Sequence, residues 1–153
     1  MEKLKEELGD EFFFIIRTHY FIADKLDFTG VEDFVFNGSQ YDDVTELYLV
    51  SDVLITDYSS VFFDYANLKR PILFFTYDLE KYRDTLRGFY IDLEKDVPGP
   101  LLRTTEEIIE VLTDLDGLNR VYGTRLNQFY DRYCHLDKGT ASKQIAEKVI
   151  VGK

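Results

Sequence analysis

The sequence predicts an α/β fold built on a mainly parallel sheet that is flanked by helices. Short apolar runs of strand length alternate along the chain with amphipathic runs of helix length, an order that is typical of parallel sheets with helical crossovers. Polar clusters follow two of the apolar runs directly, and in such sheets ligands bind beyond the carboxyl ends of the strands. We therefore expect a single domain over residues 1–153, with its site where two strands end.

The predicted strands are short and apolar. They cover residues 12–16, 34–36, 52–55 and 72–75, with a further short strand at 89–91. The first of them is apolar at every position, which is typical of a strand covered on both faces. An Asn-Gly-Ser turn at residues 37–39 closes the second strand, and Pro71 opens the fourth.

The predicted helices are recognised by amphipathic spacing and by their ends. They cover residues 2–8, 44–50, 60–68, 78–86, 104–112, 116–133 and 140–151. Gly9 and Gly88 are expected to end the first and the fourth helix. Asp43 stands at the start of the second, and the run Thr104 to Glu107 is typical of a helix start. Residues 96–100 are expected to form a turn-rich loop.

The composition excludes several classes of protein. Hydrophobic residues make up 45% of the 153 residues, which is enough for the core of one domain. A net charge of -11 argues against a protein that wraps nucleic acid, although a local basic pocket could hold a small phosphorylated ligand. The single cysteine, Cys134, is expected to be half-buried and fits a reducing compartment. No apolar run approaches a membrane span, and no signal peptide opens the chain.

The segment Thr56-Asp57-Tyr58-Ser59-Ser60 lies between an apolar strand and an amphipathic helix. Backbone N–H groups at a helix start attract anions, so Ser59 and Ser60 could hold phosphate oxygens there. Alternatively, a serine caps the helix, which contributes about 1 kcal/mol, and the two roles are compatible. The roles of Thr56 and Asp57 are left open: each could stabilise the turn itself or contact a ligand.

A second polar cluster, Arg17-Thr18-His19, ends the first predicted strand. The planar guanidinium of Arg17 suits phosphate oxygens. His19 can titrate near neutral pH, so it could stabilise or protonate a leaving phosphate. The alternatives are a surface salt bridge for Arg17 and a hydrogen-bonded structural role for His19. His135 lies among polar residues after a helix and is interpreted as a surface group.

Other charged residues and motifs give weaker indications of function. Asp64 lies one turn into the helix after Ser60, where it could reach ribose hydroxyls or simply be a solvated helix residue. Arg83 and Arg87 could form a positive face with Lys81, but a solvated surface with ion pairs is the simpler interpretation. The sequence contains no Gly-rich phosphate loop and no Cys/His cluster with zinc spacing. The Arg and His after the first strand also argue against a receiver domain, which needs an acidic pair there.

The segment from Ser51 to Tyr65, centred on Thr-Asp-Tyr-Ser-Ser, strongly resembles the CDP-glycerol glycerophosphotransferase family of teichoic acid synthesis. Residues 17–19 are similar to the family's Arg-x-His element. The likeness continues through Arg70-Pro71-Ile72, Phe75-Thr76-Tyr77-Asp78, Arg87-Gly88-Phe89-Tyr90 and Pro98-Gly99-Pro100. Two positions depart from it: Tyr20 stands where proline commonly follows the histidine, and Lys138 is an extra residue in a terminal Asp-Gly-x-Ala-Ser element.

The resemblance implies a Rossmann-like domain that forms most of the C-terminal half of a GT-B-like enzyme. The chain would then be the nucleotide-donor-binding part of a longer two-domain protein. By the same resemblance, His19 and Arg17 would contact the donor diphosphate as catalytic residues. The substrate-binding residues would be Thr56, Asp57, Ser59, Ser60 and Asp64, with the two serines on phosphate oxygens and Asp64 on the ribose.

The reaction implied by the resemblance transfers glycerol phosphate, or a related polyol phosphate, from its CDP carrier to an acceptor hydroxyl. CMP leaves, and a converging Arg, His and helix start would stabilise its charge. No cofactor and no metal are expected. The absent N-terminal half would bind the polyol-phosphate or lipid-linked acceptor and supply a further histidine, so that the chain alone would be inactive. We expect a cytoplasmic location, no nucleic-acid partner, and at most peripheral membrane contact.

The competing hypothesis belongs to another functional class. A truncated homologue could be a non-catalytic module that keeps this fold and binds a nucleotide or a protein partner. An enzyme requires a preceding α/β domain in the same protein, whereas a module does not.

Overall fold

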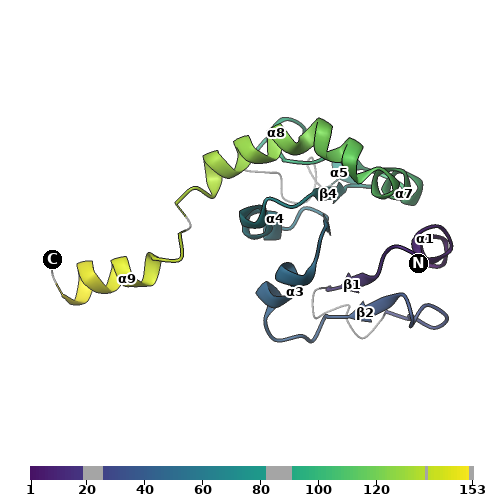
Figure 1. Cartoon of the computed structure of the whole chain (residues 1–153), viewed down its shortest axis with the longest axis horizontal. Helices are drawn as coiled ribbons and strands as arrows, with labels where there is room; N and C mark the ends of the chain where they lie inside the picture. The colour runs from purple at the N-terminus through teal and green to yellow at the C-terminus, as the bar shows by residue number, and fades with distance from the viewer. Residues whose placement is uncertain (19–25, 82–90, 137, 152–153) are drawn as a thin grey trace.

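A computed structural model describes residues 1–18, 26–81, 91–136 and 138–151 and shows a mixed α/β arrangement (Figure 1). The strands are β1 (Phe14–Ile16), β2 (Val35–Asn37), β3 (Leu54–Thr56), β4 (Ile72–Phe75) and β5 (Leu101–Leu102). The α-helices are α1 (Glu2–Leu8), α3 (Val44–Val50), α4 (Val61–Tyr65), α5 (Leu79–Lys81), α6 (Leu93–Asp96), α7 (Thr105–Thr113), α8 (Leu115–Tyr133) and α9 (Ala141–Ile145). A 3₁₀ turn over Ala66–Leu68 prolongs α4, and a π-helical turn over Ala146–Ile150 prolongs α9.

The described strands form two parallel sheets. One pairs β1 with β2, and the other has the order β3-β4-β5. All three pairings are parallel, with Phe14 opposite Val35, Leu54 opposite Ile72, and Phe74 opposite Leu101. The expected α/β class with parallel strands is therefore confirmed, although the expected single sheet is divided among the described residues.

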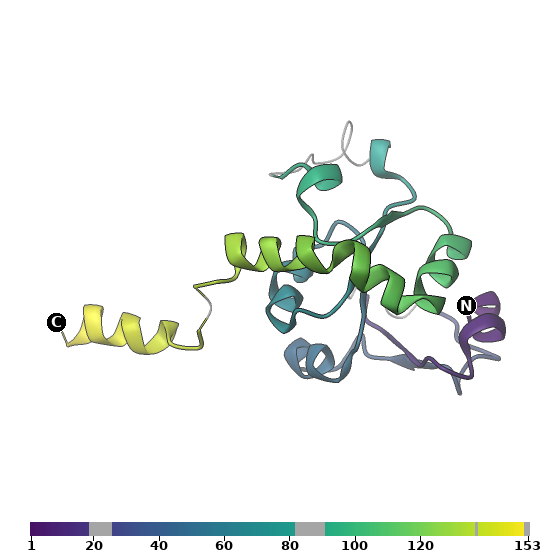
Figure 2. The same ribbon diagram turned by 45° about the horizontal axis from the view of Figure 1, so that its top comes forward.

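The β4 strand contributes to the core on both faces of its sheet, because successive side chains of a strand point to opposite faces. Ile72 and Phe74 belong to a buried cluster with residues of α4, α6 and α8, whereas Leu73 belongs to a second cluster with residues of α1 and α7. An ion pair between Lys3 and Glu106 also joins α1 to α7. Helices therefore cover both faces of the three-stranded sheet, and α8 crosses one of them (Figure 2).

Side-chain caps explain several helix starts. Asp43 caps α3 by accepting from the backbone N–H of Thr45 at 2.8 Å. Thr104 and Glu107 form a reciprocal capping box at the start of α7, which satisfies two N–H groups that a helix start otherwise leaves unpaired. The C-terminal helical segment around α9 extends away from the other elements in both views (Figures 1 and 2).

Several expected elements differ in the structure. Of the strand expected at 89–91, only Ile91 is described, and it is not in a strand. The strand β5 lies instead just after the loop expected at 96–100, and it was missed because two residues give no periodicity. That loop also holds the end of α6, where Asp92 caps the helix. Cys134 is buried, with 3% of its surface exposed, rather than half-buried.

Candidate functional site

The Thr-Asp-Tyr-Ser-Ser segment forms the turn between β3 and α4, as expected. Thr56 is the last residue of β3 and is buried. Asp57 is exposed and accepts a hydrogen bond from the backbone N–H of Ser59 at 2.9 Å, so it serves the turn, one of the two roles left open for it. Ser59 and Ser60 are exposed. Ser60 is the N-cap residue of α4, but its side chain makes no capping hydrogen bond.

The side chain of Ser60 does not cap α4, so the structure does not support the helix-capping role that was considered for this serine. Among the described residues, neither serine hydroxyl makes a hydrogen bond, and both face solvent. The α-helical part of α4 has only five residues, so its macrodipole adds little attraction for an anion. Any phosphate at this turn would be held by hydroxyls and by backbone N–H groups of the first helical turn.

A hydrogen bond that sequence reasoning missed braces this turn. The hydroxyl of Tyr58 donates to Asp78 at 2.7 Å, which ties the turn after β3 to the segment that follows β4. Burial, and then the hydrogen bond to Asp78, raises the pKa of Tyr58. Both residues belong to family-like segments of the sequence, but nothing in their spacing of 20 positions indicates that they pair. The contact positions the backbone just before the two serines.

Arg17 and Thr18 follow β1 and hold the loop after β2. The guanidinium of Arg17 donates to the carbonyl of Gly38 at 3.1 Å and to that of Tyr41. Thr18 contacts the hydroxyl of Ser39 through its backbone N–H and its side chain, each at 3.2 Å. The structural role considered for Arg17 was a surface salt bridge. Within the described part of the chain, Arg17 makes no salt bridge and instead holds two backbone carbonyls. Only one of its guanidinium nitrogens makes these bonds.

The hydroxyl of Tyr48 on α3 is influenced by charged residues that follow two different strands. Burial raises the pKa of the Tyr48 hydroxyl, the negative charge of Asp64 raises it further, and the positive charge of Arg17 lowers it. Tyr48 therefore lies within electrostatic reach of a residue after β1 and of a residue after β3.

A surface hollow of about 290 Å³ lies between α3 and α4. Thr45, Tyr48 and Leu49 line it from α3, and Asp64, Asn67 and Leu68 line it from α4 and its 3₁₀ extension. Asp64 is exposed, which agrees with the solvated alternative as well as with ligand contact. Pocket walls that combine aliphatic, aromatic and a few polar groups are typical of small-molecule sites.

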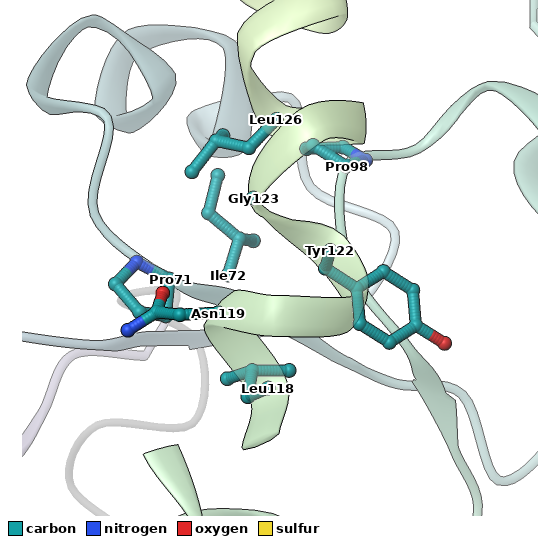
Figure 3. Close-up of a pocket in the computed structure, with 8 residues that line it drawn as sticks. All are labelled: Pro71, Ile72, Pro98, Leu118, Asn119, Tyr122, Gly123 and Leu126. Atoms are coloured by element: carbon teal, nitrogen blue, oxygen red, sulfur yellow. The ribbon is translucent and has the colours of Figure 1, made fainter. Parts of the chain in front are cut away.

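A second hollow lies between the start of β4 and α8 (Figure 3). It has a volume of about 10 Å³, which is room for roughly one water molecule. Pro71, Ile72 and Gly123 are among its lining residues. Because it lies at the amino end of β4, it is remote from the strand ends where the polar clusters gather.

His19 lies outside the described residues, as do Tyr20, Arg83 and Arg87. The distance from His19 to Ser59 and Ser60 therefore stays a prediction, and so does the positive face around Lys81. His135 is exposed, as expected. In the described ranges, no three His, Cys, Asp or Glu side chains cluster as a metal site would require, and no helix there is long and apolar enough to span a bilayer.

Comparisons with known proteins agree with the sequence resemblance. Residues 1–151 match the family described as CDP-Glycerol:Poly(glycerophosphate) glycerophosphotransferase. The chain is 49% identical over 149 residues to the teichoic acid poly(glycerol phosphate) polymerase of Bacillus subtilis strain 168, covering 97% of this chain and 20% of the relative. It is 41% identical over 149 residues to the teichoic acid glycerol-phosphate transferase of Staphylococcus aureus, covering 97% of this chain and 38% of the relative.

Solved structures show the same relationship. The wall teichoic acid polymerase TagF, soaked with CDPG, matches with a TM-score of 0.89 and 46% identity, over 95% of this chain and 36% of that one. The expected Rossmann-like, GT-B-like fold class is thereby confirmed for the matched part. The chain spans between about a fifth and two fifths of the length of these relatives. The match to residues 1–151 and the identity to these relatives show that the chain belongs to the CDP-glycerol:poly(glycerophosphate) glycerophosphotransferase family.

Proposed function

We propose that this chain is the donor-binding part of a transferase that uses CDP-glycerol, or a related CDP-polyol, in the synthesis of teichoic acid or a similar cell-wall polymer. The single observation that carries the proposal is the family match over residues 1–151. The Thr-Asp-Tyr-Ser-Ser turn supports it, because two exposed hydroxyls lie beside the first helical turn of α4. We assign residues 1–153 to one domain of a longer enzyme that acts on the cytoplasmic side of the membrane.

In this proposal, Ser59 and Ser60 donate to the non-bridging oxygens of the donor diphosphate. Arg17 and His19 approach the same diphosphate from the end of β1, and among the described residues only one guanidinium nitrogen of Arg17 makes hydrogen bonds, to two carbonyls. Asp64 accepts from the ribose hydroxyls in the hollow between α3 and α4. Thr56 and Asp57 keep the turn in shape for these contacts, and no metal or cofactor is needed.

The proposed reaction transfers a polyol phosphate and releases the negatively charged CMP. The acceptor hydroxyl attacks the phosphorus that carries the polyol, the bond from that phosphorus to the bridging oxygen breaks, and CMP leaves with the electron pair. Groups that stabilise the leaving oxygen and the diphosphate lower the barrier. The acceptor proton goes to a base that we assign to the N-terminal half of the longer protein, together with the acceptor site.

Isothermal titration of CDP-glycerol into the chain tests this proposal. Replacing both serines by alanine (Ser59→Ala/Ser60→Ala) should weaken binding about tenfold or more, because hydrogen bonds to a charged phosphate contribute roughly 1.5–3 kcal/mol each. Ser142→Ala, an exposed serine on α9, is the matched control and should leave affinity unchanged. Equal affinity of the double variant and the wild type would reject the phosphate role. In a full-length enzyme, near-normal turnover of His19→Ala would remove His19 from the mechanism.

A further inference from the structure

Two polar side chains meet where β3 and β4 end. In the parallel register, Thr56 of β3 stands opposite Phe74 of β4, so the residues that follow the two strands lie beyond the same edge of the sheet. There the hydroxyl of Tyr58 donates to a carboxylate oxygen of Asp78 at 2.7 Å. Parallel sheets of this kind bind their ligands at this edge, and Tyr58 directly precedes Ser59, which the proposed function places on phosphate.

The backbone around Asp78 is held on both sides. Thr76 is fully buried, and its N–H donates to the carbonyl of Leu102 in β5 at 2.7 Å. Leu79 is buried as well, and its N–H donates to the carbonyl of Thr76 at 3.3 Å. Because its backbone is anchored and Tyr58 binds one of its oxygens, the Asp78 carboxylate has a fixed position before any ligand arrives. A group that is ordered in advance binds a ligand more tightly, since binding does not have to order it.

Asp78 has hydrogen-bonding capacity that the described residues do not use. An ionised carboxylate can accept about four hydrogen bonds, but among the described residues only Tyr58 donates to the side chain of Asp78, and it does so to Oδ1. The residue is half-buried, and a carboxylate partly withdrawn from water costs free energy unless hydrogen bonds compensate. A purely structural bond from a tyrosine would need only a neutral acceptor. The charge and the second oxygen therefore indicate a ligand that donates hydrogen bonds.

The position of Asp78 in the fold indicates which end of the donor it meets. The helix α4 lies between α3 and α5 in both views (Figures 1 and 2), and the rings of Tyr48 in α3 and Tyr65 in α4 lie 5.8 Å apart. The hollow that holds the ribose in the proposed function lies on the α3 side, whereas Asp78 directly precedes α5. A diphosphate at the start of α4, with its nucleoside toward α3, directs its other end toward Asp78.

The chemistry of the donor selects the group that Asp78 binds. A carboxylate repels the negatively charged phosphates but accepts hydrogen bonds from hydroxyl groups. The donor carries hydroxyls in two places, the ribose, which the proposed function assigns to Asp64, and the polyol. Because Asp78 lies on the α5 side of α4, away from the hollow beside Asp64, the polyol hydroxyls are the group on its side.

We propose that Asp78 binds the hydroxyls of the polyol in the donor and is a specificity-determining residue for the group that is transferred. This inference rests on the proposed function and adds to it the residue that recognises the transferred end. One oxygen of Asp78 accepts from a polyol hydroxyl, while Tyr58 holds the other oxygen in place and is a positioning residue. The same bond joins polyol recognition to the phosphate site, because Ser59 follows Tyr58 in the turn.

Paired isothermal titrations of two ligands into the chain test this role. CDP-glycerol is compared with the n-propyl ester of CDP, which has the same charge and the same carbon chain but lacks the two free hydroxyls of the glycerol. We expect the wild-type chain to bind CDP-glycerol about tenfold or more tightly than the propyl ester, because the carboxylate makes a charged hydrogen bond to the polyol. In Asp78→Ala this preference should disappear, whereas affinity for the propyl ester should stay unchanged or rise slightly as a negative charge is removed.

Two further variants separate recognition from a structural role. Asp78→Asn keeps an acceptor for Tyr58, which preserves this contact if the alanine variant fails to fold. It should reduce the preference for CDP-glycerol only in part, because neutral hydrogen bonds are about half as strong as charged ones. Tyr58→Phe keeps the carboxylate but releases it, and it should also lower the preference in part. Asp131→Ala removes an exposed carboxylate on α8 and is the matched control, which should leave both affinities unchanged.

Equal losses for the two ligands in the Asp78 variants would overturn the proposal, since Asp78 would then act on the nucleotide part or only through the fold. An unchanged preference in Asp78→Ala would overturn it as well. So would a wild-type chain that binds the two ligands equally, and in that case the donor-binding function would still stand. A wild-type chain that binds neither ligand would contradict the proposed function itself, and with it the role of Asp78.

Discussion

The carbonyl of Ser51 accepts two hydrogen bonds, and removing both should destabilise the protein by more than the sum of removing each. The hydroxyl of Tyr65, a fully buried side chain, donates to it at 2.8 Å, and the guanidinium of Arg70 donates to it at 2.6 Å. Ser51 joins α3 to β3. The three residues therefore hold the start of the strand that leads to the candidate site.

Each single change leaves the Ser51 carbonyl with one donor. Tyr65→Phe should cost about 1 kcal/mol, the net value of one hydrogen bond. Arg70→Met should cost about 1–2 kcal/mol, because Arg70 also donates to the carbonyl of Leu49 at 2.8 Å. In the double variant no side chain is left to satisfy a half-buried carbonyl, which adds about 1 kcal/mol of coupling.

Urea unfolding of the four proteins measures this cycle through the midpoint and slope of each transition. Each kcal/mol should also lower the melting temperature by about 2–4 °C in a chain of this size. Tyr48→Phe is the control, because its hydroxyl makes no hydrogen bond with any described residue, and it should change stability little. If the double variant loses no more free energy than the two single variants together, the shared carbonyl is not what couples them.

Four further predictions concern stability. Burial raises the pKa of Tyr65 to about 12, so the unfolding free energy should fall between about pH 10 and 12 as the unfolded chain ionises first; unfolding curves of Tyr65→Phe should show a smaller loss over that range. Gly99→Ala should cost about 2–4 kcal/mol in urea unfolding, because its Cβ would lie 1.7 Å from the carbonyl oxygen of Ile72. Gly123→Ala, in α8 beside the small hollow of Figure 3, meets nothing within 4 Å and should instead stabilise by about 0.5–1 kcal/mol; a loss of stability would contradict this. Thr104→Ala should remove about 1 kcal/mol through the capping box of α7, with Thr105→Ala as the control; equal losses would reject the cap.

Most helices and strands were predictable because their signals are local. The strands β1 to β4 were found as apolar runs, and α3, α7 and α8 as amphipathic segments within one or two residues of their observed bounds. Caps such as Asp43 and Thr104 act on N–H groups two or three positions away, so their effect can be read from the sequence. The strand β5 has two residues and carries no such signal.

Part of the candidate site was predictable because it, too, depends on local sequence signals. Ser59 and Ser60 lie at a strand-to-helix turn, which adjacent segments of sequence define. The bond from Tyr58 to Asp78, and the hollow that Tyr48 and Asp64 line together, join residues that are far apart in the chain. No local pattern encodes which of these side chains meet.

The sequence by itself determined the order of the strands β1 to β4 and of the helices other than α6, the polar clusters at two strand ends and the family, because each depends on neighbouring residues or on a recognisable segment. Only the tertiary structure decided that the described strands divide into two sheets, that α3 and α4 enclose a hollow beside Asp64, and that residues of both sheets belong to one buried cluster. These features depend on how distant segments pack, and packing is set by the whole core and not by any one segment.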